Sequence, residues 1–345
     1  MIKWVPDVPD KVEDGQIWRV GLNASTARVG KETIKSYRGF GHSELFAEAA
    51  HADWERLGFK GAPSSAASFY RKMFDRVRRR DEISGVTNAS ANHLLAEGFY
   101  GGWIELIQHG YNRGPIYHYD LNRAYFWAGL EGLPTRIRRY DRGDKTFMVL
   151  CRVKSHQKEL PVMIEQRKSR VALTNEDIDL YGIEAEVFGG VSWDEDGPMF
   201  YPESVLAELA GNVSDAVFKK CMQTYWGIYA QRRAIHREIW KSGELTKSYL
   251  LRNRDQNFLW AQIIISRVTR RVYSEAEGRA RQVYVDSVLT DTPISIGEYA
   301  GDWKLVDTFP EGIVTRAPGV WTPYPIGREI KISGWHKHAG YSDVM

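Results

Sequence analysis

Residues 115–134, PIYHYDLNRAYFWAGLEGLP, constrain the fold more than any other stretch, because a strand-like pattern there turns directly into a helical one. The apolar run at 116–121 predicts a buried strand, and the aromatic-rich residues 122–130 predict a helix. Asp120 lies where the strand ends. A buried carboxylate is costly unless it is paired or bound to a metal, so Asp120 is a candidate metal ligand. Taken alone, an acid at this position is more often an ordinary strand-end residue.

A second acid, Asp286, lies inside another strand-like stretch. Residues 281–291, RQVYVDSVLTD, alternate like a β-hairpin or a buried strand with a break. Two acids from separate strands of one sheet can share two Mg²⁺ ions roughly 3.5–4 Å apart, which activate a hydroxyl and stabilise a pyrophosphate leaving group. Asp120 and Asp286 together therefore predict a site for Mg²⁺ or Mn²⁺.

Residues 213–233 predict an amphipathic helix with two different faces. Lys219, Gln223 and Trp226 are spaced to share one face. A lysine, an amide and an aromatic ring followed by Gly227 suit a triphosphate and a base, although a solvated helix face has a similar composition. The opposite face carries the packing residues Val217, Phe218, Cys221, Met222 and Tyr225.

Composition narrows the class of protein. A chain of 345 residues allows one large domain or two to three subdomains, and its net charge of +3 does not identify a nucleic-acid partner. The two cysteines, Cys151 and Cys221, are far apart in sequence, which argues against a disulfide scaffold or a zinc ribbon. They fit a reducing, cytoplasmic setting. If the protein is viral, that setting is the cytoplasm of the host cell. No apolar run approaches a membrane span. Further helices are expected at 64–80 and 257–273, and a long polar, mixed region at about 135–200.

Four short stretches stand in a fixed order along the chain. In sequence they are Tyr100-Gly101-Gly102, Asp120-Leu121-Asn122-Arg123-Ala124-Tyr125, Lys219-x-x-x-Gln223-Thr224-Tyr225-Trp226-Gly227 and Tyr284-Val285-Asp286-Ser287-Val288. This order resembles a family B DNA polymerase of the compact phage or plasmid type, near the protein-primed branch. The resemblance covers roughly residues 60–335, and Ile330–Gly334 resembles the start of that family's thumb.

Each stretch resembles its family motif with departures. The first resembles Tyr-x-Gly-Gly. The second keeps the Asp and the Tyr of Asp-x-x-Ser-Leu-Tyr-Pro, and the third keeps the Lys and the Gly of Lys-x-x-x-Asn-Ser-x-Tyr-Gly. The fourth keeps the second Asp of Asp-Thr-Asp-Ser-Ile. Residues that differ from the motifs are Arg123, Ala124, Phe126, Gln223, Thr224, Trp226 and Tyr284.

The resemblance implies a role for each motif. Asp120 and Asp286 would be the catalytic, metal-binding acids, assisted by the Leu121 carbonyl, with Mg²⁺ or Mn²⁺ as cofactor. Tyr100, Gly101 and Gly102 would contact DNA. The partners implied are primer-template DNA, dNTPs and, for processivity, a replication partner. The nucleotide-binding residues implied are Leu121, Asn122, Arg123, Tyr125, Lys219, Gln223, Trp226 and Gly227.

The resemblance also implies a fold class, which is α+β. It is a polymerase right hand with an antiparallel palm sheet, helical fingers and a reduced thumb. The chain would divide into an N-terminal region at 1–95, the palm at 96–135 and 231–300, the fingers at 136–230 and a small thumb at 301–345. The 99 residues before Tyr100 contain no Asp-x-Glu pair in an apolar strand, so no intrinsic 3′–5′ exonuclease is expected.

Three functions fit these observations. The first is a template-directed DNA polymerase that extends a primer 3′-OH. The second is a polymerase-derived protein that binds DNA or a replication partner without synthesis, which the departures from the motifs favour. The third is a primase-like polymerase or terminal transferase on the same palm, suggested by Arg123 in place of serine. The mode of priming is left open.

Overall fold

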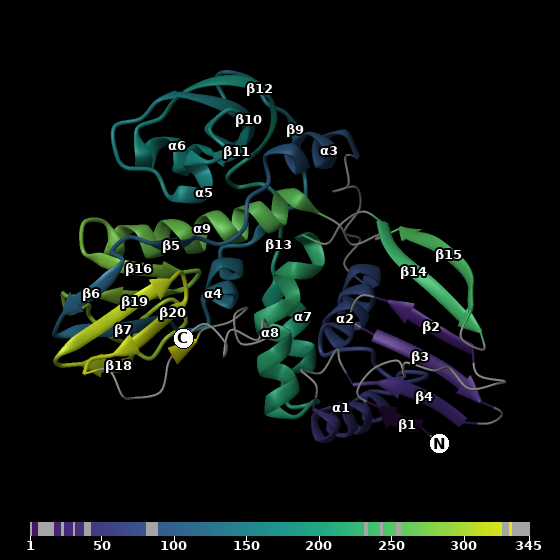
Figure 1. The fold of residues 1–345 in the computed structure, drawn as a ribbon. Coiled ribbons are helices and arrows are strands. Elements are labelled where there is room, and N and C mark those ends of the chain that lie inside the picture. The colour runs from purple at the N-terminus through teal and green to yellow at the C-terminus, as the bar shows by residue number, and fades with distance from the viewer. Residues whose placement is uncertain are drawn as a thin grey trace. The chain divides into compact units, whose positions relative to one another are not determined.

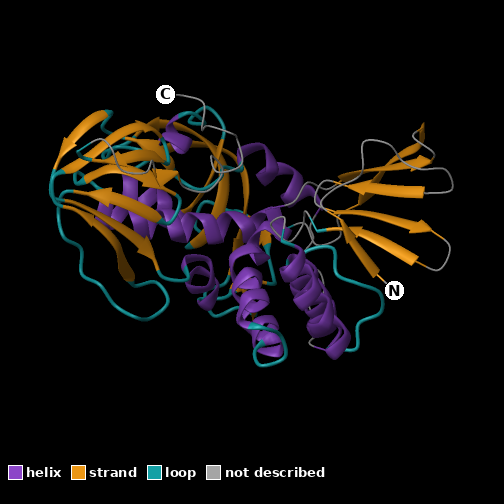
Figure 2. Cartoon of the chain, turned by 60° about the horizontal axis from the view of Figure 1, so that its bottom comes forward, coloured by secondary structure: helices purple, strands orange, loops and turns teal. Residues whose placement is uncertain are grey.

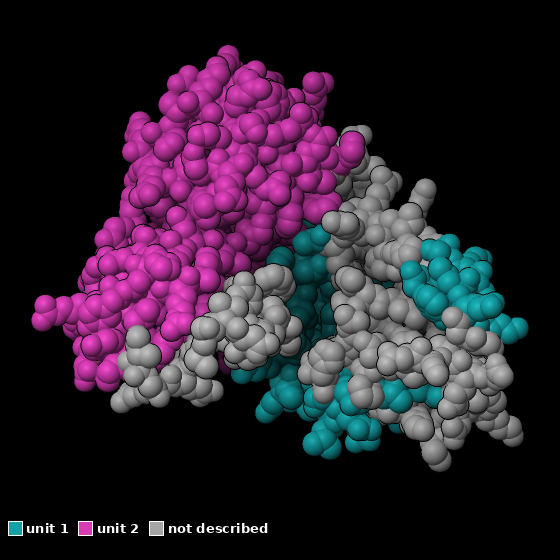
Figure 3. Space-filling model, viewed as in Figure 1, with its two compact units in different colours: residues 1–84, 201–257 teal, residues 85–200, 258–345 magenta. Residues whose placement is uncertain are grey.

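The chain folds into a mixed α/β structure of two compact units. The computed structural model describes residues 2–5, 17–21, 24–29, 32–37, 43–80, 89–230, 234–241, 244–252, 257–325 and 331–332. The first unit comprises residues 1–84 and 201–257, and the second comprises 85–200 and 258–345 (Figure 3). Helices and antiparallel sheets occur in both (Figure 2), so the predicted mixture of helices with antiparallel sheets is confirmed. None of the described helices is long and apolar enough to cross a bilayer.

In its described residues, the first unit combines one sheet with four helices. Its six-stranded sheet has the order β1-β4-β3-β2-β14-β15 and is antiparallel except for the β1–β4 pair. The strands are β1 (Ile2–Val5), β2 (Ile17–Gly21), β3 (Ala24–Val29), β4 (Glu32–Ser36), β14 (Ala234–Lys241) and β15 (Glu244–Arg252). The helices are α1 (Glu44–Arg56), α2 (Ala67–Arg80), α7 (Pro202–Leu209) and α8 (Asp215–Ala230).

Helices α2 and α8 confirm two sequence predictions and form the core of the first unit. The helix predicted at 64–80 begins at Ala67, and the helix predicted at 213–233 spans Asp215–Ala230. A hydrogen bond of 2.7 Å joins the buried hydroxyls of Tyr70 on α2 and Tyr229 on α8. The Asp53 carboxylate accepts the backbone N–H of Ser214 at 2.7 Å, and so satisfies one donor at the start of α8.

The second unit is built around an antiparallel five-stranded sheet of order β18-β7-β17-β16-β5. Its strands are β5 (Ile104–Leu106), β7 (Ile116–Leu121), β16 (Ala280–Tyr284), β17 (Ser287–Thr290) and β18 (Trp303–Phe309). The strand predicted at 116–121 is confirmed. Asp286, expected inside a strand, instead lies in the two-residue turn between β16 and β17, so 281–291 forms a hairpin.

The described residues of this unit also include helices α3, α4 and α9 and two of its smaller sheets. The helices are α3 (Ala89–Gly98), α4 (Ala124–Leu130) and α9 (Phe258–Ala276), and α9 confirms the helix predicted at 257–273. A four-stranded sheet of order β21-β20-β19-β6 contains β6 (Gly110–Arg113), β19 (Gly312–Ala317), β20 (Val320–Pro323) and β21 (Lys331–Ile332). A two-stranded sheet pairs β8 (Leu133–Pro134) with β13 (Met199–Phe200).

Residues 138–193, expected as a polar, mixed region and assigned to helical fingers, instead form another antiparallel sheet of order β11-β10-β12-β9. Four consecutive residues of its central strand, 148–151, are fully buried, which supplies the apolar core that the polar composition concealed. The elements are β9 (Arg138–Arg139), β10 (Thr146–Ser155), α5 (Val162–Glu165), β11 (Val171–Thr174), α6 (Asn175–Tyr181) and β12 (Glu184–Trp193).

Helix α9 holds the second unit together. It runs between the five-stranded sheet and the β10–β12 sheet (Figure 1), and thirteen of its residues are buried. The unit boundaries fall after residues 84, 200 and 257. The sequence resemblance instead places the boundaries of the palm and fingers after residues 95, 135, 230 and 300. The palm, fingers and thumb assignments stay predictions, and Ile330 and Ser333–Gly334 of the expected thumb motif lie outside the described residues.

Candidate active site: two carboxylates on neighbouring strands

The structure brings Asp120 and Asp286 together at one end of the five-stranded sheet. Strand β17 pairs with β7 so that Ser287 lies opposite Asp120. The backbone N–H of Leu121 donates to the carbonyl of Asp286 at 2.7 Å, which ties the hairpin turn to the end of β7. The two acids, 166 positions apart in sequence, therefore belong to one site.

The two carboxyl groups interact electrostatically. Burial, followed by repulsion from the Asp120 carboxylate, raises the pKa of Asp286 from 3.8 to about 7. Two neighbouring carboxylates resist ionising together because like charges repel, and a cation between them removes that repulsion. Such a pair is therefore best satisfied by a bound cation.

Strained backbone flanks both acids. Among the described non-glycine residues, two have positive φ: Arg123 at 51° and Val285 at 60°. Arg123 forms the turn from β7 into α4, and Val285 is the first residue of the hairpin turn, immediately before Asp286. Positive φ costs an L-residue roughly 1–2 kcal/mol, and a β-branched residue is especially unsuited to it. Strain of this kind persists where the surrounding structure fixes a functional geometry.

The Tyr100-Gly101-Gly102 segment supports the strained turn. The N–H of Val285 donates to the carbonyl of Trp103 at 2.6 Å. A Cβ atom at Gly102 would lie 2.7 Å from Cγ1 of Val285, so this position needs glycine. The predicted glycine-rich motif therefore packs directly against the turn that carries Asp286.

The Tyr100 ring does not face solvent, contrary to the expectation that it contacts DNA. Its exposed fraction is 2%. Its hydroxyl has no hydrogen-bond partner among the described residues, and its backbone N–H donates to Gln262 Oε1 at 3.2 Å. Burial, then the nearby Asp177 carboxylate, raises the pKa of Tyr100 well above its ordinary value, so the phenol stays neutral. A contact between this segment and DNA would have to come from backbone atoms, with Gly101 exposed.

Asn122 positions a loop rather than presenting its amide group to a ligand. Its side-chain nitrogen donates to the carbonyls of Glu298 at 2.8 Å and Tyr299 at 3.1 Å. Its backbone N–H donates to the Asp302 carbonyl, and its own carbonyl accepts the N–H of Gly301. The prediction that Asn122 binds a nucleotide therefore needs revision, because both amide hydrogens already serve the 298–302 loop.

The remaining predicted residues near Asp120 are placed as follows. Leu121 is buried, so only its backbone is available to a ligand. Arg123 is exposed beside the acids, and Tyr125 is half-buried on the first turn of α4. These positions leave Arg123 and Tyr125 as the side chains of this motif that stay candidates for nucleotide contacts.

Two polar residues that sequence reasoning missed stand next to the acids. The Lys304 ammonium nitrogen lies 3.1 Å from Oδ2 of Asp120. His118, two residues before Asp120 on β7, shares a 2.7 Å hydrogen bond between its Nε2 and the Ser287 hydroxyl. No local motif marks either residue, since Lys304 reaches the site only through the register in which β18 pairs with β7.

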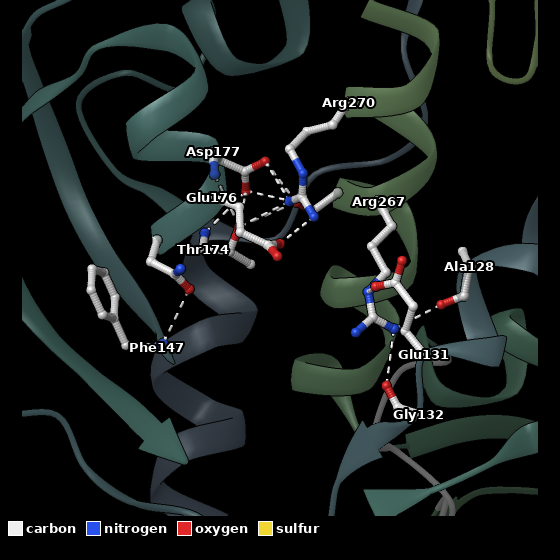
Figure 4. A network of polar contacts seen from close by, with 11 residues as sticks. Ala128, Glu131, Gly132, Phe147, Thr174, Glu176, Asp177, Arg267 and Arg270 are labelled. Atoms are coloured by element: carbon white, nitrogen blue, oxygen red, sulfur yellow. Dashed lines mark hydrogen bonds and ion pairs between the residues drawn. The ribbon is translucent and has the colours of Figure 1, made fainter. Parts of the chain in front are cut away.

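Helix α9 holds α4 and α6 through two arginines (Figure 4). Arg267 donates to the carbonyls of Ala128 and Gly132 at 2.8 and 2.9 Å, and so holds the end of α4. Arg270 donates to the buried Asp177 carboxylate at 3.1 Å and also pairs with Glu176 on α6. Asp177 further accepts hydrogen bonds from Ser266 and Thr174.

The residues predicted to bind the triphosphate and the base lie on α8, and their role stays a prediction. Lys219 and Gln223 are exposed, Trp226 and Gly227 are half-buried, and a Cβ atom at Gly227 would meet no atom within 4 Å. Of the packing face predicted for the helix, Val217, Cys221 and Tyr225 are buried, whereas Phe218 and Met222 are half-buried. Helix α8 belongs to the first unit and both acids belong to the second, so a site shared by the two stays a prediction.

The donor set at the acids fits Mg²⁺ or Mn²⁺. Within the described residues, no cluster of three or more His, Cys, Asp or Glu side chains could hold a metal. A closed structural metal site is therefore not formed by these residues. Mg²⁺ is commonly held by one or two carboxylates, with water and substrate phosphates completing its octahedron, and Asp120 and Asp286 supply such a pair.

Comparison with known proteins identifies the fold. No protein-family model matches the chain, and no curated protein sequence matches it. Structures of phi29 DNA polymerase do match. The complex with primer-template DNA, a post-translocation binary complex, gives a TM-score of 0.60 at 11% identity over 91% of this chain and 73% of that one. The ternary complex with primer-template DNA and incoming nucleotide substrates gives 0.57 at 11%, covering 86% and 70%.

An orthorhombic crystal form of the same polymerase matches 97% of this chain and 77% of that one, at 12% identity and a TM-score of 0.56. Identities of 11–12% show likeness of fold. The fold of this chain therefore resembles that of a DNA polymerase.

Proposed function

We propose that this protein is a template-directed DNA polymerase that adds dNTPs to a primer 3′-OH. The observation that carries the proposal is the juxtaposition of Asp120 and Asp286 at adjacent strand ends of an antiparallel sheet, within a polymerase-like fold. Its partners would be primer-template DNA and dNTPs, as in the neighbours' complexes, with a replication partner for processivity. In this assignment the five-stranded sheet is the palm, α8 belongs to the fingers and the strands after β18 form a small thumb.

The acids perform the central task in this proposal. Asp120 and Asp286 would hold two divalent cations, which when bound would lower the pKa of the primer hydroxyl and neutralise the pyrophosphate leaving group. Because the pKa of Asp286 is raised when no cation is present, cation binding favours its ionised form. The strained turns at Arg123 and Val285 fix the two carboxylates before substrate arrives, which reduces the reorganisation needed during reaction.

The other residues bind and orient the nucleotide. Lys219 contacts the triphosphate as a point charge, and Gln223 and Trp226 flank the base. Tyr125 lies beneath the sugar and excludes a 2′-hydroxyl, and Arg123 adds positive charge near the phosphates. Backbone atoms at Gly101 and Gly102 approach the template strand. We further propose that the protein lacks 3′–5′ exonuclease activity, since the sequence before Tyr100 contains no Asp-x-Glu pair in an apolar strand.

Primer extension tests the proposal. Wild-type protein, Asp120→Ala and Asp286→Ala are incubated with a recessed primer-template, dNTPs and Mg²⁺ or Mn²⁺. Extension by the wild type that both substitutions abolish is the expected result, with the exposed Asp196→Ala as a matched control that keeps its activity. Unchanged extension in the Asp120 and Asp286 variants would refute the assignment of the acids.

A second candidate is a polymerase-derived protein that binds DNA without synthesis. Tyr284 stands where the family motif has an acid, which favours this alternative. It predicts that all the variants above bind primer-template DNA equally, while none of them, including the wild type, extends the primer. Synthesis without a supplied primer would instead indicate a primase-like polymerase.

A further inference from the structure

Lys304 is held against Asp120 by the backbone of the sheet. Strand β18 pairs with β7 so that Lys304 lies directly opposite Asp120. Side chains of directly opposed residues share one face of a sheet and lie within contact distance. The 3.1 Å separation between Nζ of Lys304 and Oδ2 of Asp120 follows from that register.

The lysine places its charge at the site of both acids. The Leu121 N–H ties the carbonyl of Asp286 to the end of β7, so the ammonium that contacts Asp120 lies at the strand end that carries both carboxylates. The ammonium therefore supplies positive charge to the pair. A divalent ion bound by the same carboxylates would supply that compensation more strongly.

We propose that Lys304 is a positioning residue that takes the place of a cation at the acid pair and is displaced when a divalent ion binds. It keeps the Asp120 carboxylate in place in the ion-free protein, and it lowers the affinity for the divalent ion because the ion pair must first break. The inference rests on the proposed function, since it assumes that Asp120 and Asp286 bind a divalent cation.

The geometry allows such an exchange. The Lys304 and Asp120 side chains are 53% and 32% exposed, so solvent can take up the released ammonium. Lysine carries a compact charge on a flexible four-carbon stem, which can turn away without moving the strand. An ion pair of this exposure contributes modestly, which corresponds to about a two- to fivefold effect on an equilibrium constant.

Direct binding of Mn²⁺ to the full chain tests the inference without any catalytic readout. Free Mn²⁺ is titrated by electron paramagnetic resonance at low salt, without DNA or dNTP, for the wild type, Lys304→Met, Lys304→Arg and Asp120→Asn. Lys304→Met is expected to bind Mn²⁺ about two- to fivefold more tightly than the wild type, and the difference should shrink at high salt. Lys304→Arg keeps the charge and is expected to stay near the wild type.

The controls distinguish a failure of the metal site from a failure of the role of Lys304. The exposed Lys145→Met removes one positive charge elsewhere in the same unit and should leave binding unchanged. If Lys304→Met binds Mn²⁺ equally or more weakly while Asp120→Asn loses binding, the metal site stands and the role of Lys304 is refuted. If wild-type binding is absent or indifferent to Asp120→Asn, the metal site itself fails, and the inference fails with it. A thermal melt of Lys304→Arg and Lys304→Met identifies any loss of folding.

Discussion

Replacing Asp286 by Asn should change how the stability of the metal-free protein depends on pH. The carboxyl has an ordinary pKa of 3.8 in the unfolded chain and a pKa raised to about 7 in the folded one. Between these values the folded state binds more protons than the unfolded state. The contribution of this carboxyl to the free energy of unfolding of the wild type therefore falls as pH rises from about 4 to 7 and is constant above that.

The expected change in unfolding free energy follows from the size of the pKa shift of Asp286. Each pH unit in this window changes the free energy of unfolding by about 1.4 kcal/mol. From pH 5 to pH 8 the wild type crosses about two such units, so it loses about 2–3 kcal/mol that Asp286→Asn does not lose. Without metal, Asp286→Asn should therefore lose less of its unfolding free energy between pH 5 and pH 8 than the wild type loses.

Denaturant titrations of both proteins, followed by tryptophan fluorescence in metal-free buffer at pH 5 and pH 8, measure the difference. Asp196→Asn, at an exposed position, serves as the control and should follow the wild type at both values. Added Mg²⁺ at pH 8 should restore stability to the wild type and leave Asp286→Asn unaffected. If the stabilities of the wild type and Asp286→Asn change with pH in parallel, burial and the Asp120 charge do not raise the pKa of this carboxyl in the folded protein.

Three further substitutions test the surroundings of the site. Gly102→Ala should lower the melting temperature, with a free-energy cost of about 1–3 kcal/mol from overpacking against Val285, and Val285→Ala in the same chain should restore part of it. Asp177→Asn should cost about 3 kcal/mol in a denaturant titration, since it leaves the charge of Arg270 without its buried partner, and a smaller loss would mean that Glu176 suffices. Lys219→Ala should raise the KM for dNTP about ten- to hundredfold while primer-template binding is unchanged, and an unaltered KM would remove this lysine from the nucleotide site.

Elements with strong local patterns could be predicted from the sequence. The apolar run at 116–121 and the helical periodicities of α8 and α9 appear in the structure within a few residues of their expected ends. The alternation at 281–291 indicated a hairpin or a buried strand with a break, because its apolar and polar residues change with the period of a strand, and the structure forms the hairpin. These segments depend mainly on their own residues.

Elements that depend on distant partners could not be predicted from the sequence. Strand β10 is stabilised by pairing with β11 and β12 on either side, and its polar neighbours in sequence conceal the four buried residues at its centre. Lys304 enters the site through strand register alone. Nothing in the sequence around Arg123 or Val285 predicts positive φ, since glycine or asparagine is the usual residue there.

The hairpin turn shows why a valine can be kept in so unfavourable a conformation. Val285 donates its N–H to the Trp103 carbonyl, and its side chain fills the space that the absent Cβ of Gly102 leaves. The next residue, Asp286, then has its carbonyl fixed by Leu121 at the end of β7. A glycine at 285 would relieve the strain, but it would also remove the packing against Gly102 and loosen the turn. Since a pair of neighbouring carboxylates separates by repulsion unless the backbone holds it, the strained valine is best understood as part of what keeps Asp286 beside Asp120.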